Sequence, residues 1–174
     1  MKTRIALVTT LVLLAAAAGN AQAQRLELDS LDRLAKQAVD SVNINIDQSL
    51  LGFASGFLKG SGDDAEVKKL LSQLRGIYVR RFEFDRDVDL VADLDPIRKQ
   101  LTGKGWVRLI EVDSKRDREF VEVYSWRDGD VSGGLAILAA EPNEVTVVNI
   151  VGPIDPSKLG ALRGLGVPDI PDAR

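Results

Sequence analysis

The sequence predicts an α+β domain, in which a mostly antiparallel sheet packs with helices. Four runs rich in Val, Ile, Leu and aromatic residues follow one another near the C-terminus, and only short turn sequences separate them. Strand-like and amphipathic helical runs precede them. We therefore expect a four-strand C-terminal meander, plus one or two N-terminal strands, with the helices covering it.

The first 23 residues have the pattern of a secretory signal peptide. Lys2 and Arg4 form the charged start, residues 5–18 the apolar core, and residues 21–23 (Ala-Gln-Ala) the small-x-small cleavage site. The apolar run is shorter than the roughly 20 residues of a spanning helix. We expect a periplasmic or secreted protein that starts at Gln24 and is not an integral membrane protein after cleavage.

Composition limits the domain count and the chemistry. The remaining chain suits a single domain, residues 24–167, followed by a flexible tail, residues 168–174. Removal of Lys2 and Arg4 with the signal peptide changes the net charge from −3 to −5. The remaining chain has no run of basic residues, so we do not expect nucleic acid as a partner. The chain has no His and no Cys, which excludes imidazole or thiol catalysis and conventional zinc sites. We expect no enzyme activity and no cofactor.

The elements before residue 60 alternate in type. Apolar residues at spacings of three and four predict a helix over residues 26–38. Val42, Ile44 and Ile46 alternate with polar residues, which indicates a short strand. Asp47 is a typical N-cap. The apolar side of the helix that it starts consists of Leu50, Leu51, Ala54, Phe57 and Leu58, and Gly60-Ser61-Gly62 ends that helix.

Another helix, a strand and a further helix lead to the meander. Residues 64–74 are predicted to form a helix with one apolar stripe, which consists of Val67, Leu70, Leu71 and Leu74. In the strand at residues 77–84 the alternation changes parity, which indicates either a β-bulge at Arg80-Arg81 or a regular strand with the stem of Arg80 extending toward solvent. In the helix at residues 87–101, Pro96 either starts a second segment or introduces a kink.

The meander comprises residues 106–113, 119–126, 131–140 and 144–151. Asp128-Gly129 suits the tip of a two-residue hairpin, which would place Trp126 opposite Val131 and Glu122 opposite Leu135. A second tip at Pro142-Asn143 would place Ile137 opposite Val148 and Leu135 opposite Ile150. In this register one face is aromatic and the opposite face is aliphatic, with Asn149 as its polar interruption.

A sheet that is apolar on both faces needs two covers. The second cover is the protein's own helices, which we favour, a second copy of the chain, or a ligand. Exposed aliphatic strips mark interaction sites. The candidate interaction face on this reading consists of Val121, Val123, Leu138, Val145 and Val147.

Three features near the meander carry weaker chemical signals. Glu122 on the aromatic face is a candidate acid, although an ion pair with Arg108 or Arg80 is the favoured interpretation. The aspartates between residues 85 and 95 resemble a Ca²⁺ loop only in number and fit a helix start better. Gly133-Gly134 lies within a strand and indicates room for a bulky neighbour, such as Tyr124.

Three apolar patterns resemble one known family. They are SVNINIDQSLLGFASGFL (residues 41–58), LRGIYVRRFEF (residues 74–84) and VTVVNIVGPI (residues 145–154), and Trp106 joins them. The chain resembles the bacterial envelope family catalogued as domain of unknown function 4252 over nearly its whole mature length. The resemblance implies a secreted, single-domain α+β protein and brings no activity or catalytic residues.

Two functions from different classes fit these observations. The favoured one is a non-enzymatic interaction or accessory protein of the cell envelope, whose partner is an unknown envelope protein or a second copy. The alternative is a carrier of a lipid or other apolar molecule, with the Gly-containing helix at residues 50–58 as a mobile cover.

Overall fold

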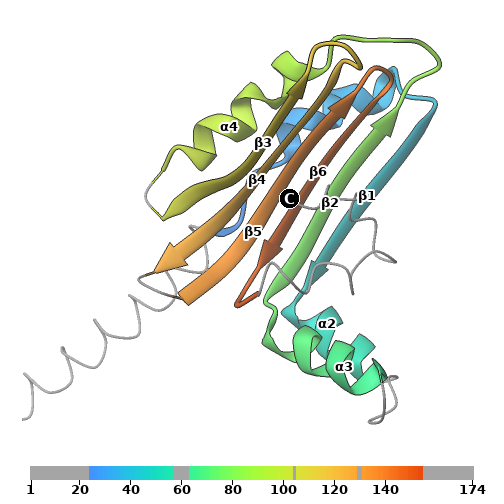
Figure 1. Ribbon diagram of the computed structural model, residues 1–174. Helices are drawn as coiled ribbons and strands as arrows, with labels where there is room; N and C mark the ends of the chain where they lie inside the picture. The colour runs from blue at the N-terminus through green and yellow to red at the C-terminus, as the bar shows by residue number, and fades with distance from the viewer. Residues whose placement is uncertain (1–23, 57–62, 104, 129–130, 155–174) are drawn as a thin grey trace, which may run out of the picture.

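The computed structural model describes residues 24–56, 63–103, 105–128 and 131–154. It contains one antiparallel sheet of six strands in the order β1-β2-β6-β5-β4-β3 (Figure 1). The strands are β1 (Asp40–Asp47), β2 (Gly76–Glu83), β3 (Trp106–Ser114), β4 (Glu119–Asp128), β5 (Val131–Glu141) and β6 (Glu144–Val151). The helical elements are η1 (Asp29–Lys36), α2 (Gln48–Ser55), α3 (Asp63–Gln73), η2 (Val91–Leu94) and α4 (Asp95–Leu101).

This architecture confirms the α+β prediction and the C-terminal meander. Each of the four meander strands begins at the residue that the sequence predicted. The sheet has six strands because β1 and β2 pair with each other and β2 then pairs with β6. The tip between β5 and β6 is also as predicted, since Ile137 pairs with Val148 and Leu135 with Ile150.

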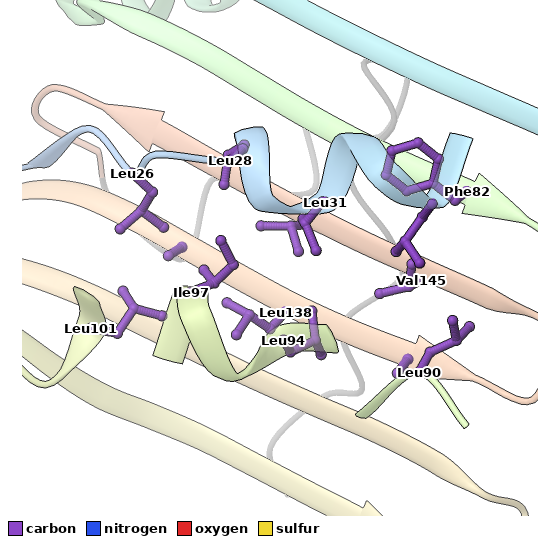
Figure 2. Close-up of a cluster of buried hydrophobic side chains, with 14 of the residues drawn as sticks. Leu26, Leu28, Leu31, Phe82, Leu90, Leu94, Ile97, Leu101, Leu138 and Val145 are labelled. Atoms are coloured by element: carbon purple, nitrogen blue, oxygen red, sulfur yellow. The ribbon is translucent and has the colours of Figure 1, made fainter. Parts of the chain in front are cut away.

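The first face of the sheet is covered by η1, η2 and α4. Leu31, Leu94 and Ile97 of these elements have no exposed surface. Figure 2 shows them together with Leu26, Leu28 and Leu101, against the sheet residues Phe82, Leu138 and Val145. Aliphatic and aromatic side chains thus fill this side of the sheet, which is the larger of two hydrophobic cores.

The helix predicted over residues 26–38 is a 3₁₀ helix, and it is shorter than predicted. The reason is visible in the spacing of Leu28, Leu31 and Leu34, which repeats every three residues. A 3₁₀ helix has three residues per turn, so this spacing aligns the side chains on one line, whereas an α-helix would splay them.

Residues 24–28 precede η1 and pack into the same core. Asn149 of β6 is fully buried; its Oδ1 accepts a hydrogen bond from Leu26 N–H (2.9 Å), and its Nδ2 donates to the Gln24 carbonyl (3.0 Å). In the same way, the side chain of Gln100 in α4 binds the backbone of Glu27. Its Oε1 accepts a hydrogen bond from the Glu27 N–H, and its Nε2 donates one to the Glu27 carbonyl. The polar interruption in β6 therefore satisfies buried backbone groups of the N-terminal segment.

The helix predicted over residues 87–101 is interrupted. It consists of the short 3₁₀ turn η2 followed by α4, with Pro96 in the first turn of α4. Proline is tolerated at this position, because no intrahelical hydrogen bond is lost there. Of the two sequence alternatives, Pro96 starting a second segment is therefore correct, and residues 87–90 are not helical.

The second face carries a separate core near the end where α2 and α3 lie (Figure 1). Asp47 caps α2 as predicted, with its Oδ1 accepting from Leu50 N–H (3.0 Å). The expected apolar side of α2 is wrong at Leu50, which is 51% exposed, while Leu51 is buried. Ala54, Phe57, Leu58 and Gly60-Ser61-Gly62 lie outside the described side chains. The predicted stripe of α3 is confirmed, because Leu70, Leu71 and Leu74 are buried.

The strand β2 is regular, without the alternative β-bulge at Arg80-Arg81. However, the side chain of Arg80 does not extend into solvent. It is 5% exposed, and its guanidinium donates to Asp32 Oδ1 (2.9 Å) and Asn45 Oδ1 (3.1 Å). Such pairing is what allows a guanidinium to be buried.

The predicted register of the β4–β5 hairpin is wrong. Val131 pairs with Asp128, and a β-bulge follows Trp126, which pairs with Gly134. The extra residue is Gly133, where a Cβ atom would lie 2.7 Å from the ring of Trp126. The bulky neighbour of the glycine pair is thus Trp126 rather than Tyr124. A one-residue bulge exchanges the faces of every residue beyond it.

Candidate functional site

The corrected register divides the candidate interaction face between the two sides of the sheet. Val121 and Val123 lie on the second face, in line with Leu135 and Ile137 of β5. Leu138, Val145 and Val147 lie on the first face. The predicted register placed all five residues on one face because it did not include the bulge at Gly133.

Burial separates these residues further. Leu138, Val145 and Val147 are at most 1% exposed and belong to the core under η1 and α4. Val123 is also buried. Only Val121 is partly exposed, so it is the one predicted residue that can contribute side-chain surface to a contact.

Val121 belongs to an aliphatic surface that we call the β3 flank, which consists of Val107, Ile110, Val112 and Val121. On β3 the side chains directed to the second face are Val107, Ile110 and Val112, whereas Arg108, Glu111 and Asp113 are directed to the first face. Val107 is 48% exposed and the other three are partly exposed. On an edge strand with one solvated face, the side chains of that face are normally polar. The β3 flank is aliphatic instead, although its side chains are at least partly exposed.

Glu122 lies on the first face, as predicted, but next to Leu138 rather than Leu135. It is 3% exposed; its Oε1 accepts from Arg108 Nη1 (3.1 Å) and its Oε2 from Arg98 Nε (3.0 Å). The predicted ion pair with Arg108 is thus confirmed, and the one with Arg80 is wrong. Two guanidinium groups occupy the two carboxylate oxygens, so the buried charge is compensated, and removing one partner would leave it unpaired.

The neighbours of Glu122 respond to it electrostatically. Its hydrogen bond to Arg108 is the main cause that raises the pKa of that guanidinium. The pKa of Tyr124 is raised, first by burial of its hydroxyl and then by the negative charge of Glu122.

Sequence reasoning missed Arg98, which stacks over the Phe120 ring at 4.4 Å. The available sequence signal was its place beside the apolar Ile97 in a predicted helix.

A cleft of about 420 Å³ lies at the end of the sheet away from α2 and α3, between the β3–β4 turn and residues 87–91. Carboxylates dominate its charge, namely Asp87, Asp89, Asp113, Glu119 and Glu141, with Lys115 and Arg118 opposing them. On the second face, Glu141 of β5 lies directly opposite Glu144 of β6. Burial is the main cause that raises the pKa of Glu141, and Glu144 and Glu119 add to it.

The aspartates between residues 85 and 95 are dispersed among separate partners. Asp93 pairs with Arg33 of η1, Asp95 with Arg98, and Asp87 with Arg118. Asp89 caps the Val91 N–H. Within the described part of the chain, no three His, Cys, Asp or Glu side chains are arranged to hold a metal ion.

Comparison with known proteins places the chain in one family. The family described as "Domain of unknown function (DUF4252)" matches residues 36–162. The chain belongs to this family. The match spans all six strands and the helical elements α2, α3, η2 and α4, but only the last residue of η1, so the matched region is the sheet with four of its helical elements.

No match was found among curated proteins or among solved structures. Among the described helices, none is long and apolar enough to cross a membrane. The family model thus establishes the family, and the structure gives the fold. A functional proposal has to rest on the residues and their contacts.

Proposed function

We propose that this DUF4252 protein is an exported, non-enzymatic interaction protein of the cell envelope, and that the β3 flank contacts its partner. The single observation that supports this proposal is the placement of Val107, Ile110 and Val112. They direct aliphatic side chains to the second face of an edge strand, whereas Arg108, Glu111 and Asp113 of the same strand are directed to the first face. Exposed aliphatic strips of this kind are typical of contact surfaces.

Export is proposed from the signal-peptide pattern of residues 1–23, and one feature of the fold supports it. Gln24 is the predicted first residue of the mature chain. It is 4% exposed, and Asn149 binds its backbone carbonyl. The residue at which the cleaved chain would begin is therefore already packed into the core.

A non-enzymatic role is supported by the composition and by the saturation of the best candidate acid. The chain contains no His or Cys. Both oxygens of Glu122 already accept hydrogen bonds from guanidinium groups, so a substrate would have to displace an arginine to reach it.

The test is a pair of substitutions on neighbouring residues of β3. Val112→Lys places a charge on the β3 flank, and Asp113→Lys places the same charge on the opposite face. Both should fold, because both side chains are at least partly exposed. We expect a crosslinked partner complex to be lost in Val112→Lys and retained in Asp113→Lys. Equal complex formation by the two variants would overturn the assignment of the surface.

Carriage of an apolar molecule remains the alternative. The core on the first face is filled, as Leu31, Leu94 and Leu138 have no exposed surface, and the cleft at its end is lined largely by charged side chains. A carrier would therefore have to use the second face. Solvent extraction of the protein purified from its own envelope, followed by mass spectrometry, would detect a lipid in stoichiometric amount if the protein were a carrier.

A further inference from the structure

The two edges of the sheet differ in how they are protected against pairing with another chain. An exposed edge strand is a template for a further strand, and bulges, prolines and charged side chains normally block it. The edge strand β3 has such protection, since its register shifts between Arg108 and Ile110 and it carries charges at Arg108, Glu111 and Asp113. An additional strand would meet an irregular backbone there.

The opposite edge, β1, lacks these features. Its eight residues pair with β2 without any register shift, and they include no Pro, Lys or Arg. Its charged residues, Asp40 and Asp47, stand at its two ends, and Asp47 is used as the cap of α2. The central part of the strand therefore presents a regular, uncharged backbone edge.

The side chains of β1 have one polarity on each face. Val42, Ile44 and Ile46 are partly buried on the second face, where Ile44 and Ile46 pack against the second core. Asn43 and Asn45 lie on the first face, where Asn45 Nδ2 donates to Asn43 Oδ1 (2.9 Å) and Asn45 Oδ1 accepts from Arg80. A partner strand must therefore offer aliphatic residues to one face and polar residues to the other.

We propose that β1 pairs antiparallel with β1 of a second copy, with the two-fold axis at Ile44, so that the two sheets become one continuous sheet. Directly opposite residues of antiparallel strands lie on the same face. With Ile44 opposite its own copy, Val42 lies opposite Ile46 and Asn43 opposite Asn45. Ser41 lies opposite Asp47, so no two carboxylates face each other. Every aliphatic residue meets an aliphatic one, and every amide meets an amide.

The neighbouring registers are less favourable. If Asn43 lay opposite its own copy, Asp40 would face Ile46, which places a carboxylate against an aliphatic side chain. If Asn45 lay opposite its own copy, Val42 would face Gln48, which belongs to α2 rather than to the strand. A closed pair with self-complementary surfaces is the usual form of a homodimer. The pairing leaves the β3 flank free, because β3 is at the other edge, and it does not depend on the function proposed above.

Cysteine crosslinking tests the axis, because the natural chain contains no Cys. In Ile44→Cys the two thiols would be directly opposite, where Cβ atoms are about 4.5–5.5 Å apart and close to disulfide geometry. The matched control is Asp113→Cys at the other edge of the sheet, since Asp113 is exposed and lies on the first face of β3, outside the β3 flank. Thiols held together have an effective concentration near the millimolar range. At about 10 micromolar protein we therefore expect the disulfide dimer of Ile44→Cys to form about 100-fold faster than that of the control.

A charge exchange tests the same contact without oxidation. Ile44→Lys and Ile44→Glu should each be monomeric by native mass spectrometry, because like charges meet at the axis, and their mixture should form a heterodimer. Circular dichroism checks that both variants are folded. Equal crosslinking of the Ile44→Cys and Asp113→Cys variants, or a wild-type protein that stays monomeric at the crosslinking concentration, would overturn the proposal. If both charged variants unfold, the crosslinking result alone decides.

Discussion

Substitution of Asn149 by Ala should destabilise the fold strongly, although the residue looks like a polar defect in an apolar strand. The Asn149 side chain makes three hydrogen bonds to backbone groups, at Gln24, Leu26 and Leu135. Removing it leaves the buried Leu26 N–H without an acceptor, which costs about 1–3 kcal/mol. The space left by the amide adds about 1 kcal/mol. We therefore expect a loss of about 2–4 kcal/mol in the free energy of unfolding.

The assay is urea unfolding followed by the fluorescence of Trp106 and Trp126, the two tryptophans of the chain. The matched control is Asn143→Ala in the β5–β6 turn. This residue is exposed, and its side chain makes only a 3.4 Å bond to the Phe84 carbonyl. The control should change the unfolding free energy by no more than about 0.5 kcal/mol.

A truncated chain separates the hydrogen bonds from a general packing effect. In a chain that begins at residue 29, the groups that Asn149 binds at Gln24 and Leu26 are gone, so Asn149→Ala should cost clearly less there than in the chain that begins at Gln24. The same cost in both chains, or a loss below about 1 kcal/mol in the longer one, would refute the account of the N-terminal segment.

Other substitutions test the remaining contacts by the same unfolding measurement. Glu122→Gln removes the charge that two guanidinium groups share, and it should cost about 2–4 kcal/mol, which a purely surface role would not. The pKa of Glu141 is raised above its unfolded value of 4.5, so its ionisation destabilises the fold as the pH rises through the folded-state pKa. Because Glu141 is exposed and solvent screens its charge, Glu141→Gln should stabilise by no more than about 0.5 kcal/mol at pH 7 and have little effect near about pH 3.5; equal effects at both would contradict this cause. Gly133→Ala should cost about 1–3 kcal/mol because its Cβ would overlap an indole ring, whereas Gly52→Ala in α2 meets no atom within 4 Å and should stabilise by about 0.5–1 kcal/mol. A neutral Gly133→Ala would argue against the bulge.

Much of the fold could be predicted from the sequence because local patterns specify it. Alternation of apolar and polar residues located β1, and the Pro142-Asn143 turn fixed the register of β5 with β6. The Pro96 position and the Asp47 cap follow equally from backbone chemistry. These features depend on a few adjacent residues, which is why sequence alone predicts them.

The errors about the sheet arose where contacts between strands, or with distant segments, decide the structure. The bulge at Gly133 depends on the ring of Trp126 lying over it, and without the bulge the faces of β4 and β5 were matched incorrectly. For the same reason, the predicted interaction face mixed core residues such as Val147 with the partly exposed Val121. The partner of Asn149 is a segment more than a hundred residues earlier in the chain, so no local pattern could indicate it.

The most direct test of the proposed function places a photo-crosslinking amino acid at residue 112 or residue 113 of the full chain in its own cells. The two positions are adjacent on β3 but face opposite sides of the sheet. The account predicts an envelope-located adduct of defined mass from position 112 and none from position 113. Adducts of equal yield from both positions, or from neither, would contradict the assignment of the β3 flank as the contact surface.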